Sequence, residues 1–315
     1  MSKRQKDLWR HKHVLGIKDL NREELETIFD LTLSFKEISR RSVKKVPALC
    51  GKTIVNLFFE NSTRTRVSFE LAAKRLSADV INFSSASSSL TKGETIIDTI
   101  KNLEAYHPDI MVIRVASSAS LPALIKHTQA GVVNAGDGRD EHPTQALLDM
   151  FTAREVLGGL DGLSVLIVGD ILHSRVARSN IFGFQKFASQ VTVCAPPSLL
   201  PREFEQLGIG FTHDFDKSIS SADVIIMLRM QRERQKSSFV PSLREYCDRF
   251  ALTPERLAKA KKKCVIMHPG PVNWDVEIDS SLKDKLHPLI LKQAENGLAV
   301  RMAVLYLTGT KQKAL

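Results

Sequence analysis

Short apolar runs alternate with helical patterns along the whole chain. The runs are rich in Val and Ile, and they occupy residues 53–59, 80–83, 110–115, 132–133, 165–168, 191–194, 224–228 and 265–267. Between them, helical spacing of apolar side chains predicts helices over residues 23–39, 64–77, 94–107, 143–157, 175–187 and 254–262. Strands that alternate with helices form βαβ units, and βαβ units build parallel sheets. The pattern therefore predicts an α/β fold.

The predicted strands divide evenly into two groups. About four precede residue 140 and four follow residue 160, with the long helical stretch 143–157 and then Gly158 and Gly159 between them. This division predicts two doubly wound parallel-sheet domains joined near residues 140–160. The closing segment 290–307 carries apolar side chains on one helical face, which predicts a helix packed on a domain surface.

Composition excludes several classes of protein. The 315 residues are 43% hydrophobic and 25% charged, an ordinary balance for a globular protein and unlike that of disordered chains, collagen or small disulfide scaffolds. No apolar run approaches the roughly 20 residues that cross a bilayer, so no membrane association is expected. Residues 1–13 are basic and polar, which argues against a secretory signal and predicts a solvated arm. The four cysteines are far apart, so we expect neither a zinc site nor disulfides, and a reducing cytoplasm fits.

The net charge of +10 is compatible with nucleic acid, a membrane surface or acidic small substrates. The basic run 259–263 falls late in a predicted helix, where cations favour the carbonyl end of the dipole, so it is typical of a solvated face. Aromatic residues are only 6% and do not interleave with the basic clusters, so no nucleic-acid platform is expected. The Ser-rich segment 84–89 indicates a surface loop.

The first chemical motif follows the first strand. Ser62, Thr63 and Thr65 alternate with Arg64 and Arg66 at the start of a predicted helix. Hydroxyl groups there commonly only cap the helix. Arginines in a first turn oppose the helix dipole by about 0.3–1 kcal/mol, however, so a bound anion would explain them. Phosphate is the natural candidate, since hydroxyls, amides and a guanidinium fork would meet it together.

A second motif begins with His142. Pro143 fits the first position of a helix, which places His142 at its amino end and Gln145 one turn on. The alternative for a histidine at this position is simple capping. The positive end of the helix should keep His142 neutral near pH 7, so that it donates a hydrogen bond to a carbonyl.

Further candidates follow later strands. Residues 169–177 lack the GxGxxG pattern, which argues against dinucleotide binding. Arg175 lies in the first turn of a predicted helix, as Arg64 does, so the same argument for a bound anion applies to it. The arginines in residues 229–234 indicate either a helix with surface ion pairs or a site that recognises carboxylates. Residues 268–271 end a strand with two prolines, suited to presenting carbonyl oxygens and to a cis bond, and Arg114 ends another strand. No set of metal-ligating residues and no Ser-His-Asp catalytic triad is evident in the sequence. A pocket formed by the residues above would therefore bind polyanions and stabilise charge without covalent catalysis.

These motifs resemble those of the aspartate/ornithine carbamoyltransferase family. Residues 62–66 resemble its carbamoyl-phosphate signature, and residues 142–145 resemble its second motif. Residues 229–234 and 268–271 are similar to the aspartate-specific branch, whereas the ornithine branch shows His-Cys-Leu-Pro where Pro269 stands. The resemblance spans nearly the whole chain, in order and at family spacing.

The resemblance implies carbamoyl transfer from carbamoyl phosphate to the α-amine of L-aspartate, the committed step of pyrimidine synthesis, without a cofactor or metal. It implies a carbamoyl-phosphate domain over 1–150 with 293–315, and an aspartate domain over 151–292. The residues implied for carbamoyl phosphate are Ser62, Thr63, Arg64, Thr65, Ser89, Lys92, Arg114, His142, Gln145, Pro269 and Gly270. Those implied for aspartate are Lys92, Arg175, Arg229, Gln231, Gly270 and Pro271. The catalytic set would be Arg64, Thr65, Lys92, Arg114 and His142.

The family completes each site with Ser and Lys from a neighbouring subunit, which match Ser89 and Lys92 and imply a homotrimer with shared active sites. Glu60 would bridge the closed domains to Arg175 and Arg234. The phosphate itself would accept the amine proton, so no protein base is implied.

Two positions depart from the family pattern. Trp274 stands where Arg is common, which bears on aspartate affinity, and Val176 stands where some members have Thr. The alternatives are a carbamoyltransferase with another acceptor such as ornithine, a binding or scaffold subunit, and a nucleic-acid binder. Association with regulatory chains or a dihydroorotase, and cooperativity, stay open at this stage.

Overall fold

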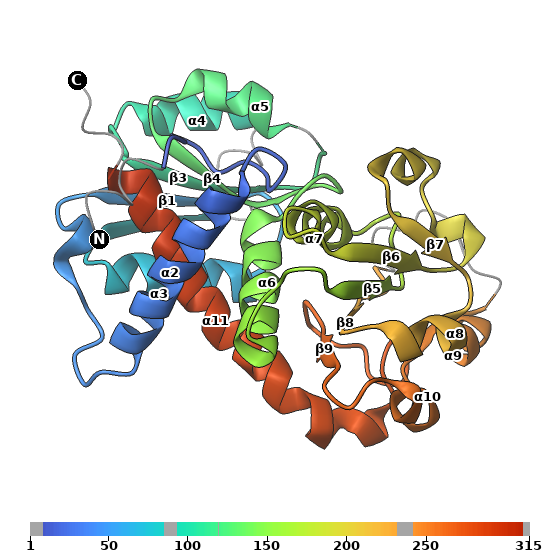
Figure 1. The fold of residues 1–315 in the computed structure, drawn as a ribbon. Helices are drawn as coiled ribbons and strands as arrows, with labels where there is room; N and C mark the ends of the chain where they lie inside the picture. The colour runs from blue at the N-terminus through green and yellow to red at the C-terminus, as the bar shows by residue number, and fades with distance from the viewer. Residues whose placement is uncertain (1–8, 85–92, 119, 232–241, 311–315) are drawn as a thin grey trace. The chain divides into compact units, whose positions relative to one another are not determined.

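The computed structural model describes residues 9–84, 93–118, 120–231 and 242–310. Two compact units are formed: unit 1 contains Met1–Leu147 and Glu295–Leu315, and unit 2 contains Leu148–Ala294. Each unit has its own parallel sheet flanked by helices (Figure 1), so the expected α/β class with two parallel-sheet domains is confirmed.

Unit 1 is built on a four-stranded parallel sheet. Its strands lie in the order β2-β1-β3-β4. They are β1 (Thr53–Phe58), β2 (Asp79–Ser84), β3 (Ile110–Val115) and β4 (Gly131–Asp137). The helices that begin in this unit are α2 (Arg22–Ser39), α3 (Thr63–Arg75), α4 (Ile96–Glu104), α5 (Leu121–Leu124) and α6 (Pro143–Leu157). The C-terminal helix α11 (Lys283–Thr310) reaches this unit from residue 295 onward.

Helices cover both faces of this sheet. On one face, Ile100 of α4 and Leu121 and Leu124 of α5 pack with alternate strand residues such as Val55 and Ile113. On the other, a Cβ atom on Gly309 of α11 would lie 3.2 Å from Ile110 of β3, so the helix backbone approaches the sheet closely. Burial on both faces explains why the strands read as continuous apolar runs rather than alternating ones.

The predicted solvated arm is wrong from Trp9 onward. The Trp9 side chain is only 2% exposed, and Val14 pairs in parallel with Val133 at the edge of β4. The Val14 amide donates to the Val132 carbonyl at 2.8 Å, and the His13 ring accepts from the Val132 amide at 3.0 Å. A strand edge carries backbone groups that need partners, and the N-terminal segment supplies them.

Unit 2 contains a five-stranded parallel sheet in the order β7-β6-β5-β8-β9. The strands are β5 (Ser164–Val168), β6 (Gln190–Cys194), β7 (Gly210–Thr212), β8 (Val224–Met227) and β9 (Val265–Met267). Its helices are α7 (Arg175–Gln185), α8 (Phe215–Ser218), α9 (Leu243–Phe250) and α10 (Pro254–Lys259). Short 3₁₀ turns complete the two units at Pro47–Leu49, Ile125–His127, Pro197–Leu199, Arg202–Leu207, Ile219–Ser221 and Ser280–Leu282.

Several elements differ from the sequence-based expectation, including the one-turn helices α5 and α8, which the apolar spacing does not predict. Strand β7 is not anticipated, because three partly exposed residues starting at a glycine carry almost no apolar signal. Helix α9 is also missed, although Ser242 caps it by accepting the Glu245 amide and it buries Tyr246 and Phe250. Helix α11 begins before the predicted residue 290 and contains Pro288 within its length.

Each sheet has one point at which the strand order reverses. In unit 1 the chain adds β2 on one side of β1 and then β3 on the other, and in unit 2 it does the same around β5 with β6 and β8. The loops that leave neighbouring strands at such a point diverge, and open α/β sheets bind ligands there, beyond the carboxyl ends of the strands. Both units therefore present a predictable place for a site.

Two general properties concern the described residues only. Among them, no helix combines the length and the apolar character needed to cross a bilayer. Within the same ranges, no group of three or more His, Cys, Asp or Glu side chains is arranged to hold a metal ion.

Candidate functional site

The β1–α3 turn of unit 1 presents an unusual helix start. The Ser62 side chain makes no capping hydrogen bond, and the first turn of α3 contains no acidic residue. Arg64 and Arg66 occupy that turn, where their charge adds to the positive end of the helix dipole. Thr65 is buried, whereas Arg64 is exposed. The turn therefore concentrates positive potential and hydroxyl groups at the carboxyl end of β1.

Arg114 lies beside this turn. It occupies the position of β3 that pairs with Phe58 of β1. Its guanidinium donates to the Ala135 carbonyl of β4 at 3.0 Å and lies 3.3 Å from the Glu60 carboxylate. These contacts hold a buried cation between β4 and the turn after β1. Glu60, predicted to bridge domains to Arg175 and Arg234, contacts Arg114 within its own unit.

A buried polar network shapes the loop between β4 and α6. The Asn134 amide group donates to the carbonyls of Leu15 at 2.7 Å and Glu141 at 3.1 Å, and its oxygen accepts the Gly136 amide at 2.7 Å. Glu141 in turn accepts the Ile17 amide at 2.7 Å. The network ties the N-terminal segment to the loop that leads to His142.

Glycine is required inside this loop. Gly138 has φ of +47°, and a Cβ atom there would lie 2.4 Å from the Ser118 backbone nitrogen. Asp137 ends β4, and burial, reinforced by Asp140, raises the pKa of its carboxyl. The loop thus combines a close backbone approach with a partly desolvated acid.

His142 and Gln145 lie at the start of α6, as predicted. Pro143 is the first helical residue, and the His142 carbonyl accepts the amides of Gln145 at 3.0 Å and Ala146 at 3.3 Å. Both side chains are largely buried. The carboxyl edge of the unit 1 sheet therefore carries three features: the β1–α3 turn with its hydroxyl groups and arginines, Arg114, and His142.

In unit 2, Asp170 organises the turn after β5. Its Oδ1 accepts the His173 amide at 3.2 Å and lies 2.8 Å from the His173 ring, and its Oδ2 accepts the Gln231 amide at 3.3 Å. Ser174 caps α7 by accepting the Ala177 amide, and the buried Arg175 follows in the first turn. One buried carboxylate therefore joins the turn carrying Arg175 to the segment carrying Gln231.

A second carboxylate, Glu277, joins the loops after β8 and β9. It accepts the Met230 amide at 2.8 Å, next to Arg229, and the Asn273 amide at 2.7 Å. The bond between Gly270 and Pro271 is cis. The predicted residues Arg175, Arg229, Gln231, Pro269, Gly270 and Pro271 all follow strands β5, β8 or β9 at the carboxyl edge of this sheet.

Some predictions are not addressed by these contacts. Ser89, Lys92 and Arg234 lie outside the described residues. The two positions that depart from the family pattern are both described. Val176 is buried in the first turn of α7. The Trp274 ring has the Lys283 ammonium 6.0 Å from its centre. The sequence motifs include Asn134 and Asp170 but assign them no role, and they do not single out Glu141 or Glu277. All four are positioning groups, and a polar residue in or near a motif is the only sequence signal that any of them carries.

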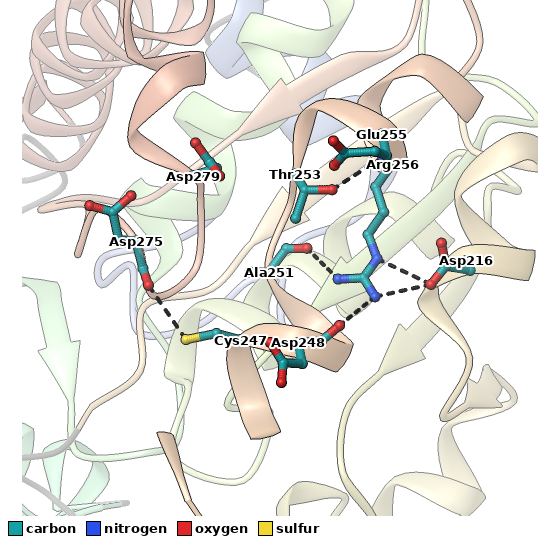
Figure 2. A pocket seen from close by; sticks show the side chains of 9 residues that line it. All are labelled: Asp216, Cys247, Asp248, Ala251, Thr253, Glu255, Arg256, Asp275 and Asp279. Atoms are coloured by element: carbon teal, nitrogen blue, oxygen red, sulfur yellow. Dashed lines mark hydrogen bonds and ion pairs between the residues drawn. The ribbon is translucent and has the colours of Figure 1, made fainter. Parts of the chain in front are cut away.

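Unit 2 also contains an acidic pocket of about 420 Å³ (Figure 2). Asp216, Asp248, Glu255, Asp275 and Asp279 contribute carboxylates to its lining. Arg256 donates to the Ala251 carbonyl at 2.7 Å and to the Asp216 carboxylate at 3.0 Å, contacts that Figure 2 marks with dashed lines. No predicted site residue in the described chain lines this pocket, so it is separate from the groups discussed above.

Comparison with known proteins matches both parts of the chain to one family. Residues 12–155 match the carbamoyl-phosphate binding domain of aspartate/ornithine carbamoyltransferases, and residues 161–308 match their Asp/Orn binding domain.

Curated relatives match over most of their length. The chain is 54% identical over 299 residues to the aspartate carbamoyltransferase catalytic subunit of Syntrophus aciditrophicus, covering 95% of this chain and 97% of that protein. It is 52% identical over 303 residues to the corresponding subunit of Syntrophobacter fumaroxidans, covering 96% and 99%.

Solved structures of similar fold come from Trypanosoma cruzi aspartate transcarbamoylase. The structure with carbamoyl phosphate and aspartate has a TM-score of 0.86 and 29% identity, covering 95% of this chain and 97% of that one. The structure with N-(phosphonacetyl)-L-aspartic acid has the same TM-score and identity, covering 95% and 96%.

We predict that Asn134→Ala destabilises unit 1 and weakens the His142 site. The change leaves the Leu15 and Glu141 carbonyls and the Gly136 amide without this partner, at a cost of about 1–3 kcal/mol for each group that is buried and unsatisfied. Chemical denaturation should show this loss. Asn102→Ala is the matched control, because Asn102 bonds Glu94 at the exposed surface of the same unit and should change stability by at most about 0.5 kcal/mol. Equal stability of the two variants would contradict the assigned role of Asn134.

Proposed function

Because the chain belongs to the aspartate/ornithine carbamoyltransferase family, we propose that it transfers the carbamoyl group of carbamoyl phosphate to the α-amine of L-aspartate. The products are N-carbamoyl-L-aspartate and phosphate, and the reaction is the committed step of de novo pyrimidine biosynthesis. The observation that carries the proposal is the gathering of cationic and hydrogen-bonding groups at the strand-order reversal of both sheets. The similar aspartate transcarbamoylase of Trypanosoma cruzi has been solved in complex with carbamoyl phosphate and aspartate.

Unit 1 is proposed to bind carbamoyl phosphate, with the assigned domain comprising 1–150 and 293–315. Ser62, Thr63, Arg64 and Thr65 would hold the phosphate through hydroxyls, amides and the guanidinium at the start of α3. The absence of an acidic residue from that first turn supports this assignment, since an anion would complement the positive end of the helix.

Thr65, Arg114 and His142 would polarise the carbamoyl oxygen. Attack by the aspartate amine forms the new C–N bond and gathers negative charge on that oxygen, where donors preorganised in a buried site are most effective. The bond from the carbamoyl carbon to the phosphate oxygen then breaks. Arg64 would stabilise the departing phosphate, which accepts the amine proton.

Unit 2, assigned to residues 151–292, is proposed to bind L-aspartate. Arg175 and Arg229 would bind its carboxylates through bidentate guanidinium contacts, together with Gln231 and the backbone near Gly270 and Pro271. Gln145 and the carbonyls of Pro269 and Gly270 would hold the carbamoyl nitrogen. Glu60 would bridge to Arg175 and Arg234 when the domains close.

Aspartate is favoured over ornithine as the acceptor. A cationic side chain would be repelled by the arginines after β8, whereas a carboxylate would be attracted. The 54% and 52% identical relatives are both named for aspartate. A scaffold role alone is not favoured, because Arg64, His142 and Arg229 are all present.

A homotrimer with shared active sites is proposed, with Ser89 and Lys92 reaching a neighbouring subunit. Support comes from exposed apolar side chains on α3 and β2, the two elements that precede residues 85–92 in the chain. Val67 and Leu71, one turn apart on α3, are 51% and 40% exposed, and Ile81 on the edge strand β2 is 45% exposed. Burial of such surface against a second copy is favourable by about 25 cal/mol per Å².

The proposed location is the cytoplasm. Cys50, Cys194, Cys247 and Cys264 are all free thiols, which fits a reducing compartment. Further partners of the trimer, such as regulatory chains or a dihydroorotase, are candidates for co-purification rather than requirements of the chemistry. Neither nucleic acid nor a membrane is needed as a partner.

The direct test measures ureido product from carbamoyl phosphate with L-aspartate or L-ornithine, alongside the mass of the protein in solution. We expect turnover with aspartate only, in particles of three chains or a multiple of three. Turnover with ornithine alone would reject the acceptor, and an active monomer would reject the shared site.

Arg64→Ala should reduce kcat by at least about 100-fold without unfolding the protein, because it removes stabilisation of the leaving phosphate. Arg66→Ala is the matched control, since Arg66 lies in the same turn and interacts with Glu70 instead. The control should retain activity within about threefold. Equal activity of both variants would refute the role of Arg64.

Mixing two inactive variants tests whether subunits share sites. Arg64→Ala and Lys92→Ala chains, dissociated and reassembled at equal amounts, should regain activity in about a quarter of the sites, since those sites combine an intact residue from each neighbour. Each variant reassembled alone is the control. No recovery in verified mixed trimers would show that Arg64 and Lys92 serve the same subunit.

A further inference from the structure

Glu277 joins two loops of unit 2 that carry residues of the proposed aspartate site. Its side chain is fully buried, at 0% exposure. Oε1 accepts the Met230 amide at 2.8 Å and the Asn273 side-chain amide at 2.7 Å, while Oε2 accepts the Asn273 backbone amide at 2.7 Å. Met230 lies between Arg229 and Gln231, so the carboxylate connects the segment after β8 to the loop after β9.

His268 extends this connection to Gly270. Its Nδ1 accepts the Gly270 amide at 2.8 Å, and its Nε2 lies 3.6 Å from Glu277 Oε2. Because Nδ1 is the acceptor, the proton of the neutral ring is on Nε2, facing the carboxylate. The His268 amide also donates to the buried Gln293 at 3.1 Å, which holds the start of the loop.

Both side chains are buried polar groups whose cost needs an explanation. A buried carboxylate is unfavourable unless it is hydrogen-bonded, and an apolar side chain of similar volume is often at least as stabilising. Here the donors that Glu277 satisfies are backbone and side-chain groups of two different loops. The arrangement specifies loop geometry, which an apolar residue would not do.

We propose that Glu277 and His268 act as one unit of positioning residues for substrate recognition. They set the distance between the segment 229–231, which would bind the aspartate carboxylates, and the backbone at Gly270, which would hold the carbamoyl nitrogen. The inference rests on the proposed function, because the substrate groups are those assigned there. Neither Glu277 nor His268 is assigned a contact with substrate.

The first test is steady-state kinetics of Glu277→Gln in the assembled enzyme. The amide cannot accept all the hydrogen bonds of the carboxylate, so KM for L-aspartate should rise about tenfold or more. KM for carbamoyl phosphate should rise less, by no more than about threefold, because a displaced Gly270 backbone loosens only the carbamoyl nitrogen while the phosphate stays bound in unit 1. Asp223→Asn is the matched control. Asp223 accepts the Ser164 amide at 2.9 Å, at the amino edge of the same sheet, and its loss should leave both KM values unchanged.

Two histidine variants test the unit and cover the case in which Glu277→Gln does not fold. His268→Asn retains an acceptor near the Nδ1 position, and His268→Gln retains a donor near the Nε2 position. Each variant keeps one of the two His268 contacts, with Gly270 or with Glu277, and loses the other. Both should therefore raise KM for L-aspartate in folded protein. If the residues act together, the Glu277→Gln/His268→Asn double variant should be no worse than the more impaired single variant.

The outcomes separate the two proposals. If the unaltered chain does not use L-aspartate, the proposed function fails and this inference fails with it. If the unaltered chain is active and folded variants keep a normal KM for L-aspartate, only the inference fails. A purely structural role would give a different result. The increases in KM caused by the two single substitutions would multiply in the double variant, and KM for both substrates would rise in proportion to the loss of thermal stability.

Discussion

Parallel strand pairing is the constraint on which the proposed chemistry of this protein depends. In a parallel sheet every carboxyl end lies at the same edge, so residues separated by tens of positions in the chain become neighbours. Residues 60–65, Arg114 and the loop to His142 meet this condition in unit 1, and residues 175, 229–231 and 268–271 meet it in unit 2. The reversal of strand order then lets adjacent loops diverge and leaves room for a ligand.

Buried polar side chains convert this general placement into defined loop geometry. Asn134 and Glu141 hold the loop after β4, and Asp170 and Glu277 hold the segment after β8. Each of the four pairs with backbone groups of an irregular segment, where no regular ladder can satisfy them. A net gain of about 1 kcal/mol per hydrogen bond is modest, but an unmade buried bond costs more, so these residues act chiefly by excluding other loop conformations.

The arginines at the start of two helices lower the intrinsic stability of those helices. Helices α3 and α7 carry arginines and no acidic residue in their first turns, which is unfavourable for an isolated helix. Anionic substrates would remove this penalty on binding. By contrast, two lysines of the basic run near the end of α10 form surface ion pairs: Lys259 bonds Asp216 and Lys261 bonds Asp223, both at 2.6 Å. The positive charge of the chain therefore has two different uses.

The amino-acid sequence by itself determined the α/β class, eight of the nine strands found in the described residues, and the residues that follow those strands, because βαβ periodicity and motif spacing are local properties. Tertiary structure alone decided the strand β7, the burial of Trp9, the pairing of Val14 with β4, and the carboxylate links made by Asp170 and Glu277. These features depend on partners more than 15 residues away in sequence, such as Val133 for Val14 and Gln231 for Asp170. A polar or short segment has no periodicity that identifies such a partner, and only the folded chain brings the two together.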